Sequence, residues 1–131
     1  MNAIERRELR EKGWENWSMV FHPSLQRLWP LVKERALKPM DVCVLTYFLS
    51  HMDVATSRVE VTTGQAAEEL GIGAHNISGC LKRLRTAQLI AKARKGSNYY
   101  WMLSPHVWHA GGYPKFGMRQ SQWEALLEAD S

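Results

Sequence analysis

The sequence predicts a mainly α-helical domain with a small β-hairpin, and three observations lead to this fold class. Apolar residues recur at helical spacing in several segments, most regularly on either side of Gly71-Ile72-Gly73. Two β-prone runs follow, separated by a turn segment that contains Gly96. The longest apolar stretch, near 42–49, is too short to cross a bilayer, so we expect no membrane association.

The composition is that of an ordinary globular protein. The chain has 131 residues, 45% of them hydrophobic and 23% charged, which fits one domain with a real core. Its start lacks an apolar signal region and its two cysteines lack CxxC spacing, which favours the cytoplasm. We expect a charged N-terminal arm over 1–16, the main domain over 17–112, and a C-terminal extension with a short helix over 113–131.

The first half of the main domain predicts a helical core. A β-like run at 17–21 precedes a helix over 25–36, which Pro30 can interrupt. The longest apolar helix is expected over 42–51, and a short strand at 59–61. The wide apolar face of that helix consists of Val44, Leu45, Phe48, Leu49 and Met52.

Residues 61–85 predict two short helices joined by a tight turn. Thr62 or Thr63 can cap the first, which runs from about Gln65 to Leu70. The second starts near Ala74, and its apolar face is formed at i, i+4 and i+7 by Ile77, Leu81 and Leu84. Two helices joined in this way form the unit that places its second helix in a DNA major groove.

A β-hairpin is expected directly after the second helix. Strands are predicted at 89–93 and 99–103, with a turn over 94–98. A hairpin in this place is a wing, so the predicted fold is a winged helix-turn-helix. Beyond it, 111–114 is expected to be a loop and 119–129 a helix.

Positive charge is concentrated on this unit. Residues 62–104 hold six basic and two acidic side chains, so the net charge of this segment equals the +4 of the whole chain. A basic excess on a helix-turn-helix and wing favours a polyanionic partner.

The side of the second helix opposite its apolar face is expected to meet DNA. The residues that would read base edges there are Ala74, His75, Asn76, Ser78 and Gly79. Asn76 suits adenine, although capping the helix is an equal alternative. Gly79 costs ~1 kcal/mol in helix propensity, which close approach to DNA or packing against another chain would explain. Backbone and wing contacts are expected from Thr63, Lys82, Arg83, Arg85, Lys92, Arg94, Lys95, Ser97 and Asn98.

Signals for catalysis are absent from the sequence. It contains no Gly-rich phosphate loop, and its histidines are scattered. His106 and His109 have the i, i+3 spacing of a helical metal pair, but no Cys or carboxylate lies between or just beyond them. We therefore expect no enzymatic activity, no cofactor and no metal.

The order of motifs resembles a known family. The pattern T-x-x-x-A-x-E-L-G-I begins at Thr63, L-K-R-L-R-T-A-Q-L-I at Leu81, and S-P-H-V-W-H-A-G-G at Ser104. Over 17–112 this is similar to the RepL-like winged-helix replication proteins of plasmids and phages, in which an Asn-Pro follows the wing where this chain has Ser104-Pro105. MarR-like repressors share the middle pattern. The resemblance implies double-stranded DNA binding without catalysis, often as a dimer.

The predicted function is sequence-specific binding to double-stranded DNA in plasmid or phage replication initiation or its control. A winged-helix transcriptional repressor and a protein-interaction module are the alternatives, and a metal-dependent enzyme is a distant third. Apolar segments at 17–36 and 119–129 predict a homodimer that reads half-sites about one turn, ~34 Å, apart. Replication or transcription machinery would be its further partner.

Overall fold

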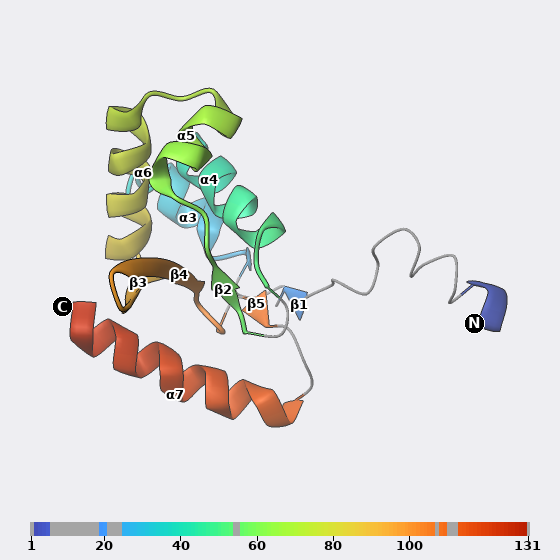
Figure 1. Ribbon diagram of the computed structural model, residues 1–131. Helices are drawn as coiled ribbons and strands as arrows, with labels where there is room; N and C mark the ends of the chain where they lie inside the picture. The colour runs from blue at the N-terminus through green and yellow to red at the C-terminus, as the bar shows by residue number, and fades with distance from the viewer. Residues whose placement is uncertain are drawn as a thin grey trace.

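The computed structural model describes residues 2–5, 19–20, 25–53, 56–106, 108–109 and 113–130. It is mostly helical, with a small three-stranded antiparallel sheet (Figure 1). The helices of the domain are α3 (Leu28–Lys33), α4 (Pro39–Ser50), α5 (Thr63–Leu70), α6 (Ala74–Thr86) and α7 (Tyr113–Asp130). The strands are β1 (Met19–Val20), β2 (Arg58–Val59), β3 (Ile90–Lys95), β4 (Asn98–Leu103) and β5 (Trp108–His109).

Helix α4 is the centre of the helical layer. It begins at Pro39, three residues before the predicted start, because proline needs no intrahelical donor in the first turn. The carboxylate of Asp41 accepts the backbone N–H of Lys38 at 2.7 Å and caps the helix. The predicted apolar face is confirmed where it is fully buried, at Val44, Leu45 and Phe48.

Helices α5 and α6 pack on α4 and on each other, joined by a three-residue connection. Thr62 caps α5 by accepting the backbone N–H of Gln65 at 3.1 Å, so α5 starts two residues earlier than predicted. Gly71, with φ 66°, ends it in the left-handed conformation. Helix α6 begins at Ala74 as predicted, and its expected core face is confirmed by the burial of Ile77, Leu81 and Leu84.

Strands β3 and β4 form a hairpin that follows α6 directly. Their register pairs Lys95 with Asn98, which leaves a two-residue turn in which Gly96 supplies a φ of 66°. The five-residue turn predicted at 94–98 is therefore wrong, since pairing continues further toward the tip. Strand β2 pairs with the other edge of β4, giving the sheet order β2-β4-β3. This arrangement is compatible with a helix-turn-helix followed by a wing.

Helix α7 lies across the face of the sheet that is turned away from the helical layer (Figure 1). Trp123, 2% exposed, packs there against Ala91 and Met102. The helix spans 18 residues and starts at Tyr113. The loop predicted at 111–114 is thus wrong for Tyr113 and Pro114, because proline is tolerated in a first helical turn.

The remaining segments differ in part from the predictions. Helix α3 is shorter than the expected 25–36 and holds Pro30 in its first turn, while Leu28 is buried. Strand β1 pairs antiparallel with β5. Most of the predicted N-terminal arm lies outside the described residues. None of the helices in the described ranges is both long and apolar enough to cross a membrane.

Candidate nucleic-acid interface

The first two turns of α6 present polar side chains to solvent. Ala74, His75, Asn76 and Ser78 are exposed, as predicted from the apolar face on the other side. The hydroxyl of Ser78 donates to the carbonyl of Ala74 at 3.0 Å, so in this rotamer it can only accept a further hydrogen bond. An uncovered helix face of this kind can enter a groove of DNA.

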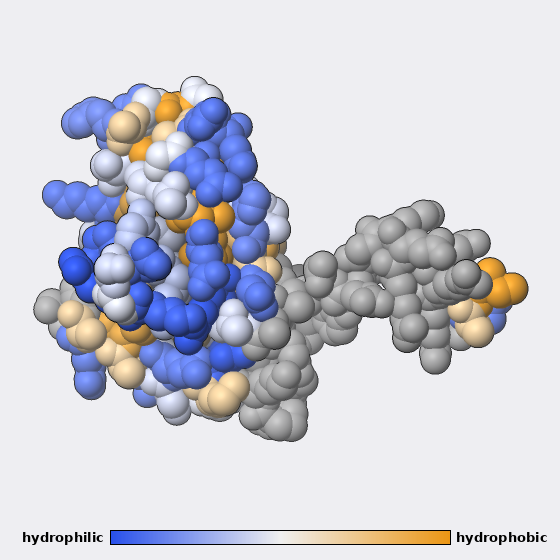
Figure 2. Space-filling model, viewed as in Figure 1, coloured by the Kyte–Doolittle hydropathy of each residue, from blue (hydrophilic) through white to orange (hydrophobic). Residues whose placement is uncertain are grey.

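The hairpin that follows α6 adds an exposed basic and polar tip. Arg94 and Lys95 end β3, and Ser97 and Asn98 form the turn and the start of β4; all four side chains are exposed. Lys82 is exposed on α6. Hydrophilic residues predominate over α6 and the hairpin in the space-filling view (Figure 2).

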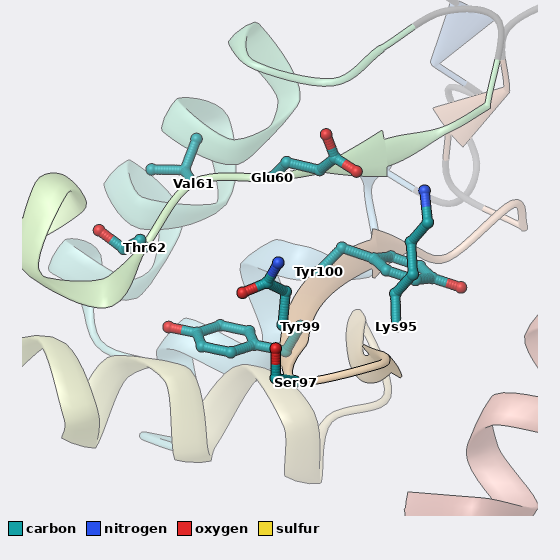
Figure 3. Close-up of a pocket in the computed structure, with 8 residues that line it drawn as sticks. Glu60, Val61, Thr62, Lys95, Ser97, Tyr99 and Tyr100 are labelled. Atoms are coloured by element: carbon teal, nitrogen blue, oxygen red, sulfur yellow. The ribbon is translucent and has the colours of Figure 1, made fainter.

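A groove of about 450 Å³ separates the hairpin from the segment that leads into α5 (Figure 3). One wall is the extended stretch from Glu60 to Thr62, and the other is the hairpin from Lys95 to Tyr100. The fold thus places the predicted wing residues opposite the beginning of α5, although they are more than thirty positions apart in the sequence.

Tyr99 is a residue of this region that sequence reasoning did not single out. Its hydroxyl accepts the backbone N–H of Thr63 at 3.3 Å and lies 3.2 Å from the Thr63 hydroxyl. Hydrogen bonding to the Thr63 side chain lowers the pKa of Tyr99; burial opposes this shift, and the Thr63 amide and Lys92 reinforce it. Thr63, a predicted contact of the DNA backbone, therefore has its backbone amide engaged within the protein.

Lys92 also has a partner inside the fold. Its ammonium group lies 4.2 Å from the ring centroid of Tyr99 and 5.7 Å from that of Trp101. A cation placed over aromatic rings is stabilised by their quadrupoles. Lys92 is half-buried here, whereas Arg94 and Lys95 beyond it extend from the tip.

Arg83, a predicted contact of the DNA backbone, is paired with a carboxylate within the protein. Its Nε donates to one carboxylate oxygen of Asp41 at 2.7 Å and its Nη2 to the other at 2.9 Å, so these groups are not directed at a phosphate. A Cβ on Gly79 would lie 3.3 Å from Nη1 of Arg83. The glycine therefore has a packing explanation within its own chain, besides the two considered from the sequence.

The last predicted backbone contact, Arg85, is half-buried near the C-terminal end of α6 and makes contacts within the protein.

Burial raises the pKa of the Cys80 thiol to about 11, with hydrogen bonding to Asp41 as the next cause. This thiol is 1% exposed and lies on the inner side of α6, so it belongs to the core.

A second cluster missed from the sequence links α4 to α5. The hydroxyl of Tyr47 donates to Oε2 of Glu69 at 2.5 Å, and Nε2 of His51 lies 3.4 Å from the same oxygen. No periodic pattern signals such a contact, because Tyr47 and Glu69 lie 22 positions apart on different helices and His51 directly follows the last residue of α4. The cluster links α5 to the central helix α4.

The histidine spacing noted in the sequence does not make a helical pair. His106 lies in a turn and His109 in β5, so neither is on a helix. Within the described part of the chain, no three His, Cys, Asp or Glu residues gather in a way that could hold a metal ion.

Comparisons with known proteins leave the function to be inferred from these residues. No family model and no curated protein matches the chain. Among solved structures, the chain is similar to the YusO protein from Bacillus subtilis, with 12% identity and a TM-score of 0.44 over 98% of this chain and 80% of that one. A likeness at this level carries no argument about function.

Proposed function

We propose that this chain is a winged helix-turn-helix protein that binds double-stranded DNA sequence-specifically. The observation that carries the proposal is that two exposed surfaces belong to one helix-turn-helix and hairpin unit: the polar start of α6 and the basic tip of the hairpin that follows α6. The buried residues of α6 support the polar face by holding the helix against α4 and the sheet.

Each surface has a distinct part in this proposal. The first turns of α6 would enter the major groove, where the side chains of His75 and Asn76 reach base edges and Asn76 pairs with adenine. Lys82, Arg94 and Lys95 would contact phosphates, which position the protein without reading the sequence. The groove between the hairpin and the start of α5 gives room for a sugar-phosphate backbone.

The proposed biological role rests on the resemblance described for residues 17–112. We propose that the protein acts in the cytoplasm, as a homodimer without catalytic activity, in plasmid or phage replication initiation or its control. Repression of transcription through the same surfaces is the alternative, with replication or transcription machinery as the further partner. The arrangement of the bound sites discriminates between these roles, because direct repeats are typical of replication control.

Selection from a pool of random duplexes tests the proposal. The wild-type protein is compared with Asn76→Ala on α6, Arg94→Ala at the hairpin tip and Glu124→Ala on the exposed side of α7 as a control. We expect the wild-type protein to enrich one motif. Asn76→Ala should lose the base preference at one position of this motif, and Arg94→Ala should select the same motif with lower affinity. Glu124→Ala should match the wild-type protein in both motif and affinity. No enrichment at physiological salt would refute specific DNA binding and favour a protein-interaction module.

A further inference from the structure

The buried pair of Asp41 and Arg83 joins the recognition surface to the central helix. Asp41 is 0% exposed, and its carboxylate accepts three hydrogen bonds, from the backbone N–H of Lys38 and from Nε and Nη2 of Arg83. The two bonds from Arg83 form the planar fork geometry that arginine makes with carboxylates. A fork of this kind fixes both the distance and the relative orientation of α4 and α6.

The carboxylate is charged in this environment. Burial raises the pKa of Asp41, but hydrogen bonding to the Arg83 side chain and to the Lys38 amide more than offsets it, so the pKa lies below its usual value. Replacing a buried ion pair with apolar residues is often neutral or stabilising, and fixing a register or orientation is its best-attested role. A positional role is therefore more consistent with this pair than a purely stabilising one.

Gly79 belongs to the same arrangement. It lies one turn before Arg83 on α6, and the guanidinium passes over it on the way to Asp41. A Cβ at this position would lie 3.3 Å from Nη1 and 3.7 Å from Nη2, so the guanidinium would have to give way by a few tenths of an ångström. The loss of helix propensity at a mid-helix glycine is thus explained by the space that the pair requires.

The pair lies beside the residues proposed to read bases. A groove of about 330 Å³ runs between α4 and α6, and His75 and Asn76 line it together with Gly79 and Arg83. The apolar contacts of α6 hold it against the core but are non-directional, so they leave some freedom of rotation about the helix axis. The directional fork from Arg83 removes that freedom, and any rotation of α6 moves Asn76 relative to a base edge.

We propose that Asp41 and Arg83 are positioning residues for DNA recognition, which set the orientation of α6 and thereby the discrimination between sequences without contacting DNA. This inference depends on the proposed binding through α6. It assigns to Arg83 a role that differs in a measurable way from a phosphate contact. A phosphate contact raises the affinity for all DNA sequences equally and makes binding more dependent on salt concentration. A positioning residue raises the affinity for the specific site alone.

The test compares dissociation constants for a selected site and for a scrambled duplex at several salt concentrations. The variants are Asp41→Asn, Arg83→Met, Arg83→Lys and Gly79→Ala, with Lys82→Met as the neighbouring solvent-exposed cation. We expect Asp41→Asn and Arg83→Met to lower the ratio of specific to non-specific affinity by about tenfold, the discrimination of one base contact. Scrambled-duplex affinity and the salt slope should be unchanged by Arg83→Met. A variant that combines Asp41→Asn with Arg83→Met should lose no more of the ratio than the worse of the two single variants.

Lys82→Met should instead weaken both duplexes equally and reduce the salt slope by about one. Arg83→Lys keeps the charge but not the fork, and Gly79→Ala leaves the pair in place but crowds it. Both should lower the ratio partially, so the inference stays testable if Asp41→Asn does not fold. A wild-type ratio in these folded variants, or a reduced salt slope in Arg83→Met, would overturn the positioning role alone. A wild-type protein that prefers no sequence would overturn the proposed function and this inference together.

Discussion

The hydroxyl of Tyr99 accepts the backbone N–H of Thr63 at 3.3 Å and so joins the hairpin to the first turn of α5. The contact links two parts of the proposed interface that are 36 positions apart in the sequence. Tyr99 also lies under the ammonium group of Lys92 on the neighbouring strand, so its ring takes part in a contact within the hairpin as well. The hydrogen bond to Thr63 thereby restrains the hairpin relative to the start of α5.

Removing this hydroxyl should loosen the hairpin from α5. We expect Tyr99→Phe to lower the free energy of unfolding by about 1 kcal/mol, the usual net contribution of one hydrogen bond, with the ring contacts preserved. Urea unfolding measures the loss. The matched control is Tyr100→Phe, which removes the neighbouring hydroxyl and leaves the Thr63 contact in place. Equal effects of both variants would contradict the special role of Tyr99.

The exposed tip of the hairpin should contribute to DNA affinity through charge alone. Lys95→Ala is expected to weaken binding to all duplexes by a similar factor and to reduce the slope of log K against log salt by about one. Lys33→Ala makes the same charge change at the end of α3 and should leave the slope unaltered. If Lys95→Ala affected only the selected site, Lys95 would be reading bases instead.

Helix α7 should be held to the sheet mainly by Trp123. This side chain is 2% exposed and fills the space between α7 and the sheet, so Trp123→Ala should destabilise the protein by about 3–5 kcal/mol. Glu124→Ala, on the exposed side of the same helix, should change stability by less than about 0.5 kcal/mol. Thermal unfolding of the two variants decides whether α7 is part of the cooperative unit, since equal midpoints would show that it is not.

Stability should fall at alkaline pH through Tyr47. Burial, followed by the hydrogen bond to Glu69, raises the pKa of Tyr47 from 10.0 to about 12 in the folded protein. The neutral phenol is thus favoured by folding, so its contribution is fully present below pH 10 and is lost as the pH rises toward 12. Tyr47→Phe should decline less steeply than wild type in urea unfolding between these limits. Parallel curves would show that the Tyr47–Glu69 contact does not contribute.

Local signals account for what could be predicted from the sequence. The turn between α5 and α6 was placed correctly because Gly71 and the threonine cap act within a few residues, and the apolar spacing of α6 identified its buried face. The sequence predicts too long a turn in the hairpin, because charged residues such as Arg94 and Lys95 are typical of turns. In the structure their backbones still pair with β4. The predicted start of α7, residue 119, lies after the observed start at Tyr113, because a segment with Tyr113 and Pro114 resembles a loop in sequence.

The contacts that organise the candidate interface could not be read from such patterns. Asp41 and Arg83 are 42 positions apart, and each alone resembles an ordinary helix-start acid or a solvated base. Only the packing of α6 on α4 brings them together. Gly79 was noticed as unusual from the sequence, but its neighbour within the fold, the guanidinium of Arg83, became apparent only in three dimensions.

Amide hydrogen exchange with and without a selected duplex tests the central claim most directly, because it reports which segments DNA covers. The account predicts slower exchange on DNA binding at residues 74–79 of α6 and 94–98 of the hairpin, with unchanged exchange along the exposed side of α7. Protection confined to α7 or α3, with α6 and the hairpin unaffected, would contradict the proposal that this chain reads DNA with its second helix and wing.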